Sequence, residues 1–303
     1  MPLLRSEAEK LSNNVLEQGV IEEIIDRDAM FALMPFKRIV GKAYLYNREN
    51  TLSEAEFLDP YEVVPEGGAD FDEVVARLRI LIGDVDIDNF LDETMDDTND
   101  QTAIQVAAKA KGMARKFQRT LAIGNQANSP KEFDGLAALC SASDQILSAG
   151  AANASASLTF EMLDALLRRV PLGADALVMR GGTHDAVLAM LRNLGGTNPD
   201  HVTLPGNGVD VPAYRRVPII VNDFLPGDED ASDNTNTCSI YAVRFNEADG
   251  VHGIFGGAAA GIRVQPIGTL QNKDAERYRL KWYCGTALKS TRSLARLKNV
   301  RNV

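Results

Sequence analysis

The sequence predicts an α+β protein whose body is built around one long amphipathic helix, with a smaller α/β domain inserted into it. Apolar residues recur with helical spacing over 98–123. Two strand-like stretches, 36–46 and 71–85, precede this helix, and two more, 262–267 and 278–288, return late in the chain. Because strands from both ends of the chain must cover one helix, the body is expected to form from segments far apart in sequence.

Composition favours a soluble globular chain. The 303 residues are 45% hydrophobic, enough for a sizeable core. No apolar run approaches the ~18 residues of a membrane-spanning helix, and no basic-then-apolar signal opens the sequence. Cys140, Cys238 and Cys284 are odd in number and widely spaced, so we expect buried free thiols in a reducing cytoplasm rather than disulfides or a zinc site.

Charge is distributed unevenly. The net charge of −10 divides into −15 in 1–100, −2 in 101–270 and +7 in 271–303. A negative total argues against broad nucleic-acid binding. Such charge blocks usually form a solvated surface. Alternatively, the acidic N-terminal part meets the basic C-terminal part, within one copy or between copies, in which case raised salt weakens assembly.

Residues 6–28 are the first predicted helix. Ser6 and Glu9 have the spacing of a capping box. The apolar face comprises Leu11, Val15, Val20, Ile21, Ile24 and Ile25. This helix packs on its own domain or reaches a neighbouring copy as an arm.

The stretches 36–46 and 71–85 are predicted to form a long two-stranded ribbon. In the second, apolar residues alternate with Arg77 and Arg79. Residues 47–70 between them are acidic and contain prolines and glycines, with no obvious core face. Because an isolated ribbon is marginal in water, it needs a partner surface that one subunit does not obviously supply.

The long helix is expected to begin at a capping box formed by Thr98 and Gln101 and to stop at Gly124-Asn125. Its apolar stripe consists of Val106, Ala110, Met113, Phe117 and Leu121. Its other face is basic and carries Lys109, Lys111, Arg115, Lys116 and Arg119. A wet helix face explains those charges better than nucleic-acid binding does.

The remaining elements follow from turn signals and short apolar runs. Residues 133–157 suit tight turns and short helices. After them we expect a helix at 160–170, a strand at 175–179, a helix at 183–194, a loop at 197–213, strands at 217–221 and 238–245, a Gly/Ala-rich segment at 253–262, a strand at 262–267, a turn at 274–277 and a strand at 278–288.

One stretch could bind an anion. Arg180-Gly181-Gly182-Thr183-His184-Asp185 lies where a strand gives way to a helix, as phosphate-binding loops do. It matches neither established phosphate-binding pattern. The better interpretation is that Gly181-Gly182 form the turn and Thr183 caps the helix.

No other group of residues suggests chemistry. His184, His201 and His252 form no metal-binding pair, Ser141, Ser143 and Ser157 lack a nucleophile motif, and Cys140 lacks a basic activator. Residues 228–234 only superficially resemble a calcium loop, because positions 233 and 239 hold Asp and Ser where Gly and Glu are needed. We therefore predict no catalytic, cofactor-binding or metal-binding residues and a structural role.

The order of these elements resembles the major capsid protein of tailed double-stranded DNA bacteriophages, whose Johnson fold is shared with encapsulin shells. The resemblance covers almost the whole chain. The stretches that carry it are the helix 98–123 with GNQANSPKEFDGL at 124–136, RRVPIIVNDFLP at 215–226, TCSIYAVRF at 237–245 and RLKWYCGTAL at 279–288.

This resemblance implies four structural parts. They are an N-terminal arm at 1–35, an extended β-ribbon loop and its base at 36–85, a peripheral domain at 86–157 and 251–290 that contains the spine helix 98–123, and an inserted α/β axial domain at 158–250 and 291–303. The ribbon would lie over an adjacent subunit.

The resemblance also implies a function. The chain would be a capsid protein that self-assembles through hexamers and pentamers into an icosahedral shell around packaged double-stranded DNA, held non-specifically. Its other partners would be a scaffolding protein, a portal and a cementing protein, without a membrane, and it would assemble in the host cytoplasm and reside in the virion. The alternatives are an encapsulin-type compartment and an α/β enzyme for an anionic substrate.

Two features of the capsid family are expected to be missing. Some branches weld their shells with Lys–Asn isopeptide bonds, but residues 49–72 contain no lysine, and Lys42 lies in the rising strand. There is also no long charged N-terminal segment that could serve as a fused scaffold. We therefore expect scaffolding from a separate protein, unless an N-terminal piece was removed, and Met1 favours the first of these.

Overall fold

The computed structural model describes residues 30–51, 55–59, 61–64, 66, 68, 70–95, 101–195, 200–203, 210–233, 236–257 and 261–301. The predicted helix 6–28 and the capping residue Thr98 lie outside these ranges. No helix in the described ranges is both long and apolar enough to cross a membrane.

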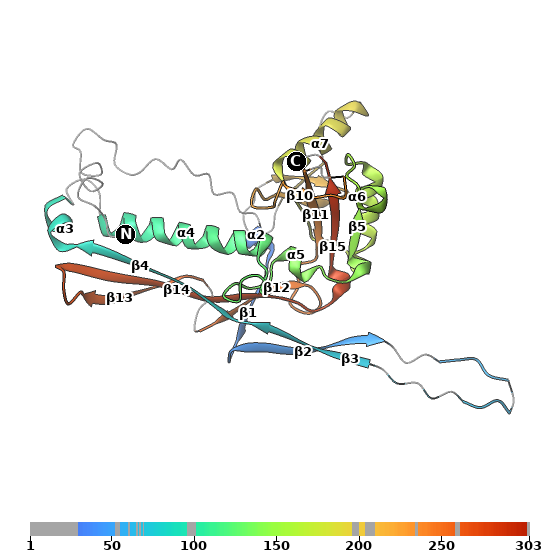
Figure 1. Ribbon diagram of the computed structural model, residues 1–303, viewed down its shortest axis with the longest axis horizontal. Coiled ribbons are helices and arrows are strands. Elements are labelled where there is room, and N and C mark those ends of the chain that lie inside the picture. Colours follow the sequence, from blue (N-terminus) through green and yellow to red (C-terminus); the bar gives the residue numbers. More distant parts are fainter. Residues whose placement is uncertain are drawn as a thin grey trace.

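The long helix and a five-stranded sheet form the elongated body (Figure 1). Helix α4 (Gln101–Ile123) ends directly before Gly124, as predicted. The strands run in the order β1-β12-β14-β13, with β4 paired to β14. Their bounds are Phe36–Ile39 for β1, Arg79–Asp88 for β4, Val251–Gly256 for β12, Arg263–Thr269 for β13 and Ala275–Leu288 for β14.

The predicted stripe of α4 faces this sheet. Met113, Phe117 and Leu121 are buried, and Val106 and Ala110 pack against the same core. The ring of Phe117 lies 4.5 Å from that of Trp282 on β14. The helix is therefore held by side chains more than 150 positions away in sequence. This contact covers the apolar stripe that would otherwise face water.

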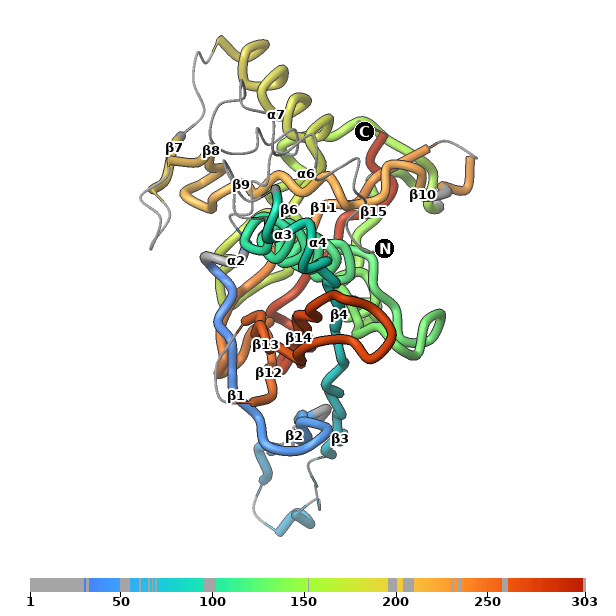
Figure 2. The backbone as a smooth tube through the Cα atoms, turned by 90° about the vertical axis from the view of Figure 1, so that its left-hand side faces the viewer, coloured from blue at the N-terminus to red at the C-terminus, as the bar shows by residue number. Residues whose placement is uncertain are grey.

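The two strands predicted before the helix each break in two. The first becomes β1 and β2 (Ala43–Thr51), and the second becomes β3 (Asp70–Arg77) and β4. Strands β2 and β3 pair only with each other and form the predicted ribbon, which extends away from the body (Figures 1 and 2). Strand β4 instead joins the main sheet, where ten of its residues pair with β14.

The second sheet has eight strands in the order β5-β15-β11-β6-β9-β8-β7, with β10 paired to β11. The bounds are Ile146–Ser148 for β5, Ala176–Met179 for β6, Asp200–Thr203 for β7, Asp210–Tyr214 for β8, Val217–Val221 for β9, Glu229–Asp230 for β10, Asn236–Val243 for β11 and Leu294–Val300 for β15.

Helices α6 (Phe160–Arg168) and α7 (Gly181–Asn193) share a core with one face of this sheet, which includes Leu163, Val187 and Ile240. Its opposite face contributes Tyr241 and Val243 to the core under α4. The short elements are α2 (Met30–Leu33), α3 (Asn89–Met95), α5 (Leu136–Leu139) and the 3-10 turns Ser143–Gln145, Ala151–Asn153 and Thr291–Ser293.

Several sequence-based assignments were wrong. Part of the loop predicted at 197–213 is strands β7 and β8. Three of the four residues of the turn predicted at 274–277 belong to β14, and the Gly/Ala-rich segment begins inside β12. The C-terminal β15 was not predicted, yet it lies between β5 and β11. Strand β5 comes from the range assigned to the peripheral domain but pairs here.

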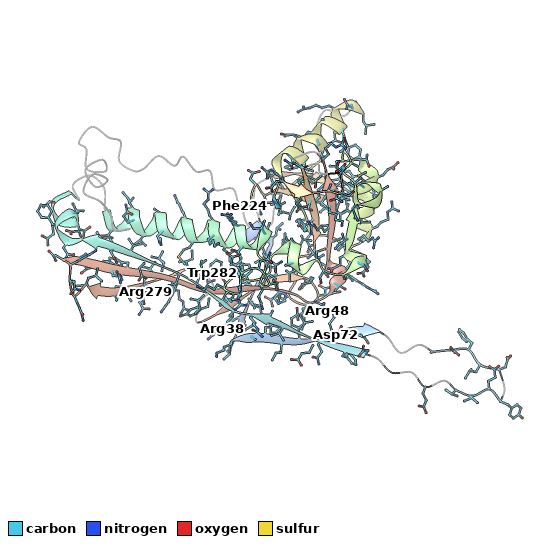
Figure 3. All side chains as sticks on the ribbon, viewed as in Figure 1. Arg38, Arg48, Asp72, Phe224, Arg279 and Trp282 are labelled. Carbon is cyan, nitrogen blue, oxygen red and sulfur yellow. The ribbon has the colours of Figure 1, made fainter. Side chains whose placement is uncertain are left out.

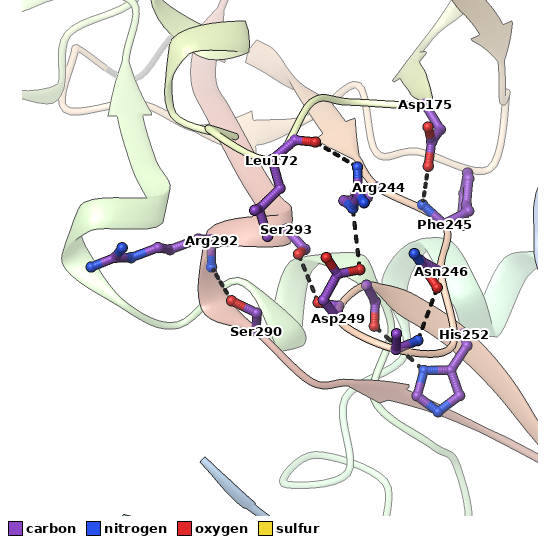
Figure 4. Close-up of polar contacts among 12 residues, drawn as sticks. Leu172, Asp175, Arg244, Phe245, Asn246, Asp249, His252, Ser290, Arg292 and Ser293 are labelled. Carbon is purple, nitrogen blue, oxygen red and sulfur yellow. Dashed lines mark hydrogen bonds and ion pairs between the residues drawn. The ribbon is translucent and has the colours of Figure 1, made fainter. Parts of the chain in front are cut away.

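The connection from β11 to β12 ties the two sheets together (Figure 4). Arg244 donates from Nε to Asp249 Oδ1 at 3.2 Å and from Nη1 to the carbonyl of Leu172 at 2.5 Å. Asp249 accepts at its main-chain oxygen from Ser293 Oγ at 2.7 Å. Hydrogen bonds therefore link the β11–β12 connection to the start of β15 and to the loop after α6.

Candidate assembly surfaces

The glycine-rich stretch at 180–185 is not the predicted turn. Helix α7 begins at Gly181 with the extended residue Arg180 as its N-cap, so both glycines lie in the first helical turn. Thr183 does not cap the helix. It is fully buried, and its Oγ1 lies 2.9 Å from Cys238 Sγ, because this face of the helix packs on β11.

The three cysteines and His252 are buried, His184 is partly buried and His201 is exposed. Burial lowers the pKa of His184 and of His252, so both rings are neutral near pH 7. Burial raises the pKa of Cys140 to about 11 and that of Cys284 to about 12, which keeps them as thiols. Within the described ranges, no three His, Cys, Asp or Glu side chains are grouped to hold a metal.

The acidic segment at 228–234 is more structured than the predicted solvated loop. Glu229 Oε2 accepts hydrogen bonds from Ser239 Oγ at 2.5 Å and from Arg296 Nη2 at 2.9 Å. Asp233 Oδ2 accepts from the hydroxyl of Ser155 at 2.7 Å. These carboxylates connect β10 and its loop to the second sheet, so they serve the fold.

The outward face of the ribbon is left uncovered by the residues that the structure describes. Its outward face carries the cross-strand pair Leu45 and Val75 together with Phe71, with exposed fractions of 57%, 43% and 60%. Apolar side chains on an exposed two-stranded ribbon gain stability only when another surface covers them.

The tip of the ribbon continues this surface away from the body (Figure 3). Phe57 and Tyr61 are fully exposed, and Val63 and Val64 are largely exposed. Residues 49–76 also hold nine acidic and no basic residues. The tip is therefore both apolar and strongly acidic, which favours a partner that offers apolar and basic groups together.

A second exposed surface lies on the main sheet, on the face opposite α4. Ile80 and Ile82 of β4 are 68% and 50% exposed there. Beside them, Arg279 binds Asp84 through two hydrogen bonds of 2.8 Å, and Arg277 binds Asp86 through bonds of 2.5 and 2.7 Å. Hydrogen bonds from these arginines hold the pKa of each carboxyl below its usual value.

Sequence reasoning anticipated the ribbon and its need for a partner, but it missed this second surface. Its residues Ile80, Ile82 and Asp84 were assigned to the ribbon. The signal was present as Asp84 and Asp86 alternating on one strand and Arg277 and Arg279 alternating on another, a pattern that fits cross-strand ion pairs.

No family model matches the sequence, and no curated protein matches it. Solved structures do match over nearly its full length. The chain is similar to the holo-SrpI encapsulin of Synechococcus elongatus PCC 7942, with 20% identity, a TM-score of 0.73 and coverage of 99% of this chain and 97% of that one.

Capsid proteins give similar values. The capsid of an empty GTA particle has 12% identity and a TM-score of 0.72, with 98% of each chain covered. The capsid of cyanophage A-1(L) has 11% identity and a TM-score of 0.68, with 97% of this chain and 98% of that one covered. The chain therefore has the Johnson fold, which resemblance in the sequence predicted and which these capsid and encapsulin proteins share.

Proposed function

We propose that this chain is a major capsid protein, which assembles through hexamers and pentamers into a closed icosahedral shell around packaged double-stranded DNA. The observation that carries the proposal is the ribbon, whose apolar outward face and apolar, acidic tip extend away from the body. A second copy would cover these side chains. In this role the chain has no enzymatic activity.

The proposed parts follow the fold. Strands β2 and β3 would supply the extended loop, α4 and the five-stranded sheet with β1 and β4 the peripheral domain, and the eight-stranded sheet with α6 and α7 the axial domain. Residues 1–35 would be the arm. A scaffolding protein, a portal and a cementing protein would be its partners, and the virion its location.

Electron microscopy of the purified protein, alongside size-exclusion chromatography, tests the proposal. Closed particles, or rings of five and six subunits, would support it. A defined small oligomer that forms neither shells nor rings, even with scaffolding protein co-expressed, would contradict it.

An encapsulin is the second candidate. It is favoured by the match to the encapsulin, which has a higher identity to this chain than the two capsids have, at a similar TM-score. The contents of the particles separate the two candidates. Nuclease-protected DNA of uniform length would support the capsid, and a co-purifying protein cargo without DNA would support the encapsulin.

The third candidate, an enzyme acting on an anion at residues 180–185, has less support. Thr183, which a phosphate-binding turn would expose, is buried against Cys238. An enzyme that uses this site would lose activity in His184→Ala, whereas a shell protein should still assemble with that substitution.

A further inference from the structure

The ribbon is joined to the body by two short breaks at the same level. One break is residues 40–42, between β1 and β2, and the other is Leu78, between β3 and β4. A single hydrogen bond, from Leu78 N to the carbonyl of Lys42 at 3.0 Å, links them. Gly41 has a φ of 115°, which side chains rarely adopt. Both strands change partners at this level, which we call the hinge, and Leu78 packs there against Ile39 and Ile254.

Beyond the hinge, hydrogen bonds from one face of the ribbon hold it against the body. Tyr46 donates from its hydroxyl to the carbonyl of Leu288 at 2.5 Å. Arg48 donates from Nη2 to that same carbonyl at 2.7 Å and from Nε to the carbonyl of Lys289 at 2.8 Å. Past Arg48, no hydrogen bond joins the described part of the ribbon to the rest of the protein.

These bonds can be exchanged for others. The acceptors of Arg48 here are neutral main-chain oxygens at the end of β14, not carboxylates. Asp72 lies opposite Arg48 in the β2–β3 register, on the same face of the ribbon (Figure 3). The Asp72 carboxylate could therefore accept a charge-assisted hydrogen bond from the Arg48 guanidinium. This would happen when the ribbon turns away from β14.

We propose that Tyr46 and Arg48 form a latch that sets the direction in which the ribbon leaves the body, and that Asp72 accepts Arg48 when the latch opens. The inference rests on the proposed function, because it assigns the latch the task of presenting the ribbon to a second copy. A shell of hexamers and pentamers places one chain in non-equivalent positions. An exchangeable latch lets the ribbon adopt more than one angle while it keeps the guanidinium paired.

The latch also affects affinity. A ribbon held in the docked direction needs no ordering when it meets its partner, whereas a free ribbon binds only in the fraction of molecules that point correctly. A hydrogen bond from a charged group changes an equilibrium constant by roughly ten-fold or more. Removal of the guanidinium should therefore lower the ratio of latched to open molecules about ten-fold.

A distance measurement tests the latch without reference to assembly. Spin labels at Val63→Cys on the tip and Ala108→Cys on α4 report the ribbon angle, and the three native cysteines are buried from the label. The doubly labelled chain is measured after dilution into unlabelled protein. Wild type should give one narrow distance distribution, Arg48→Ala a broad or shifted one, and Arg48→Lys an intermediate one.

Two further variants sharpen the test. Asp72→Asn removes the alternative partner and should give a distribution at least as narrow as that of wild type. Arg38→Ala, which removes an exposed arginine on β1 near the hinge, is the matched control and should leave the distances unchanged. Identical distributions for wild type and Arg48→Ala, with both chains folded by circular dichroism, would overturn the latch.

The assembly readout then separates the two ideas. If the latch serves assembly, Arg48→Ala should lower the yield of closed particles at a fixed concentration, whereas Arg38→Ala should not. Altered distances with wild-type assembly would confine the latch to the single chain and overturn its role in presentation. If wild type forms neither shells nor rings, even with scaffolding protein co-expressed, the proposed function fails, while the distances still decide whether the latch exists.

Discussion

Gly135 determines how the long helix can end. Its N–H donates to the carbonyl of Gly124 at 2.8 Å, so the FDGL stretch folds back on the C-terminus of α4. A Cβ at Gly135 would lie 2.6 Å from the carbonyl oxygens of Thr120 and Leu121. Because those are main-chain atoms, they cannot move aside without distorting the helix.

Gly135→Ala should therefore destabilise the protein by about 3 kcal/mol, as overpacking of a tight backbone contact does. Gly112→Ala is the matched control. Gly112 is an exposed residue inside α4 with open space where a Cβ would lie. Alanine there should raise the free energy of unfolding by about 0.5–1 kcal/mol. Chemical denaturation of both variants gives the comparison, and equal effects from the two substitutions would refute this account of the helix end.

The turn between β8 and β9 stores strain in two arginines. Tyr214 pairs with Val217, so Arg215 and Arg216 form a two-residue turn, with φ values of 52° and 67°. Asn-Gly is the usual solution for such a turn. Arg215 partly offsets its cost through an ion pair with Asp164 at 2.9 Å.

Arg216→Gly should raise the free energy of unfolding by about 1 kcal/mol, because glycine carries no penalty in the left-handed region. Arg215→Gly should gain less, because it also loses the contact with Asp164. Thermal unfolding distinguishes the two, and a loss of stability in Arg216→Gly would show that the arginine side chain has a stabilising contact of its own.

At the scale of elements, His252 couples three strands at the base of the ribbon. It lies on β12, fully buried, and its ring meets the edge of Tyr44 on β2 at 6.0 Å. Lys37 on β1 and Lys289 after β14 oppose its protonation, whereas the carbonyl of Gly250 and the charge of Glu247 favour it. Burial is the largest of these influences and lowers the pKa of His252.

Because the folded state binds this proton less readily than the unfolded state, stability should be full above pH 6.5 and should fall as the pH drops toward the lowered pKa of His252. His252→Gln should flatten that dependence. Denaturation midpoints between pH 5 and 8 provide the measurement, with His201→Gln, on the exposed strand β7, as the control. An unchanged slope in His252→Gln would exclude this histidine as the cause.

The elements also show which structural features sequence patterns could predict and which they could not. The stripe of α4 and the stop at Gly124 could be predicted because both are local. The break at Leu78 could not, since apolar and charged residues keep alternating through it in the sequence, whereas in the structure the exposed positions change from odd numbers in β3 to even numbers in β4. Residues 294–300 resemble a basic tail, and their burial results from pairing with β11 and β5, which are distant in sequence.

The candidate surfaces follow the same rule. The acidic stretch 47–70 identified the ribbon, because a stretch without a core face must be covered by another surface. The contact of Arg48 with the end of β14 could not be foreseen, since it depends on the angle at which the ribbon crosses a strand some 240 positions later. Every residue has a main-chain carbonyl, so the sequence does not show which of them will accept a side-chain hydrogen bond.

At the scale of the whole molecule, two large cores and a small cluster of Ile39, Ile254 and Ala287 at the base of the ribbon make up the described interior, and none of them includes a described residue of the ribbon tip. One core joins the two sheets under α4, and the other lies beneath α6 and α7. Substitutions at the tip should therefore leave the stability of the single chain unchanged and affect only its association, which makes the tip a clean test of shell formation.

The double variant Phe57→Ser, Val63→Ser should abolish closed particles at concentrations where wild type forms them. Full burial of a Phe or Val side chain contributes about 1.5–3 kcal/mol, so losing both weakens each contact by roughly a hundred-fold or more. Leu194→Ser, which removes a largely exposed leucine beyond the end of α7, is the control and should assemble as wild type does.

Size-exclusion chromatography and microscopy measure particle yield, while unfolding of the dissociated chain should give the same midpoint for all three proteins. Wild-type assembly by the double variant would mean that these two tip side chains make no contact that matters between copies, and the ribbon would no longer support a shell.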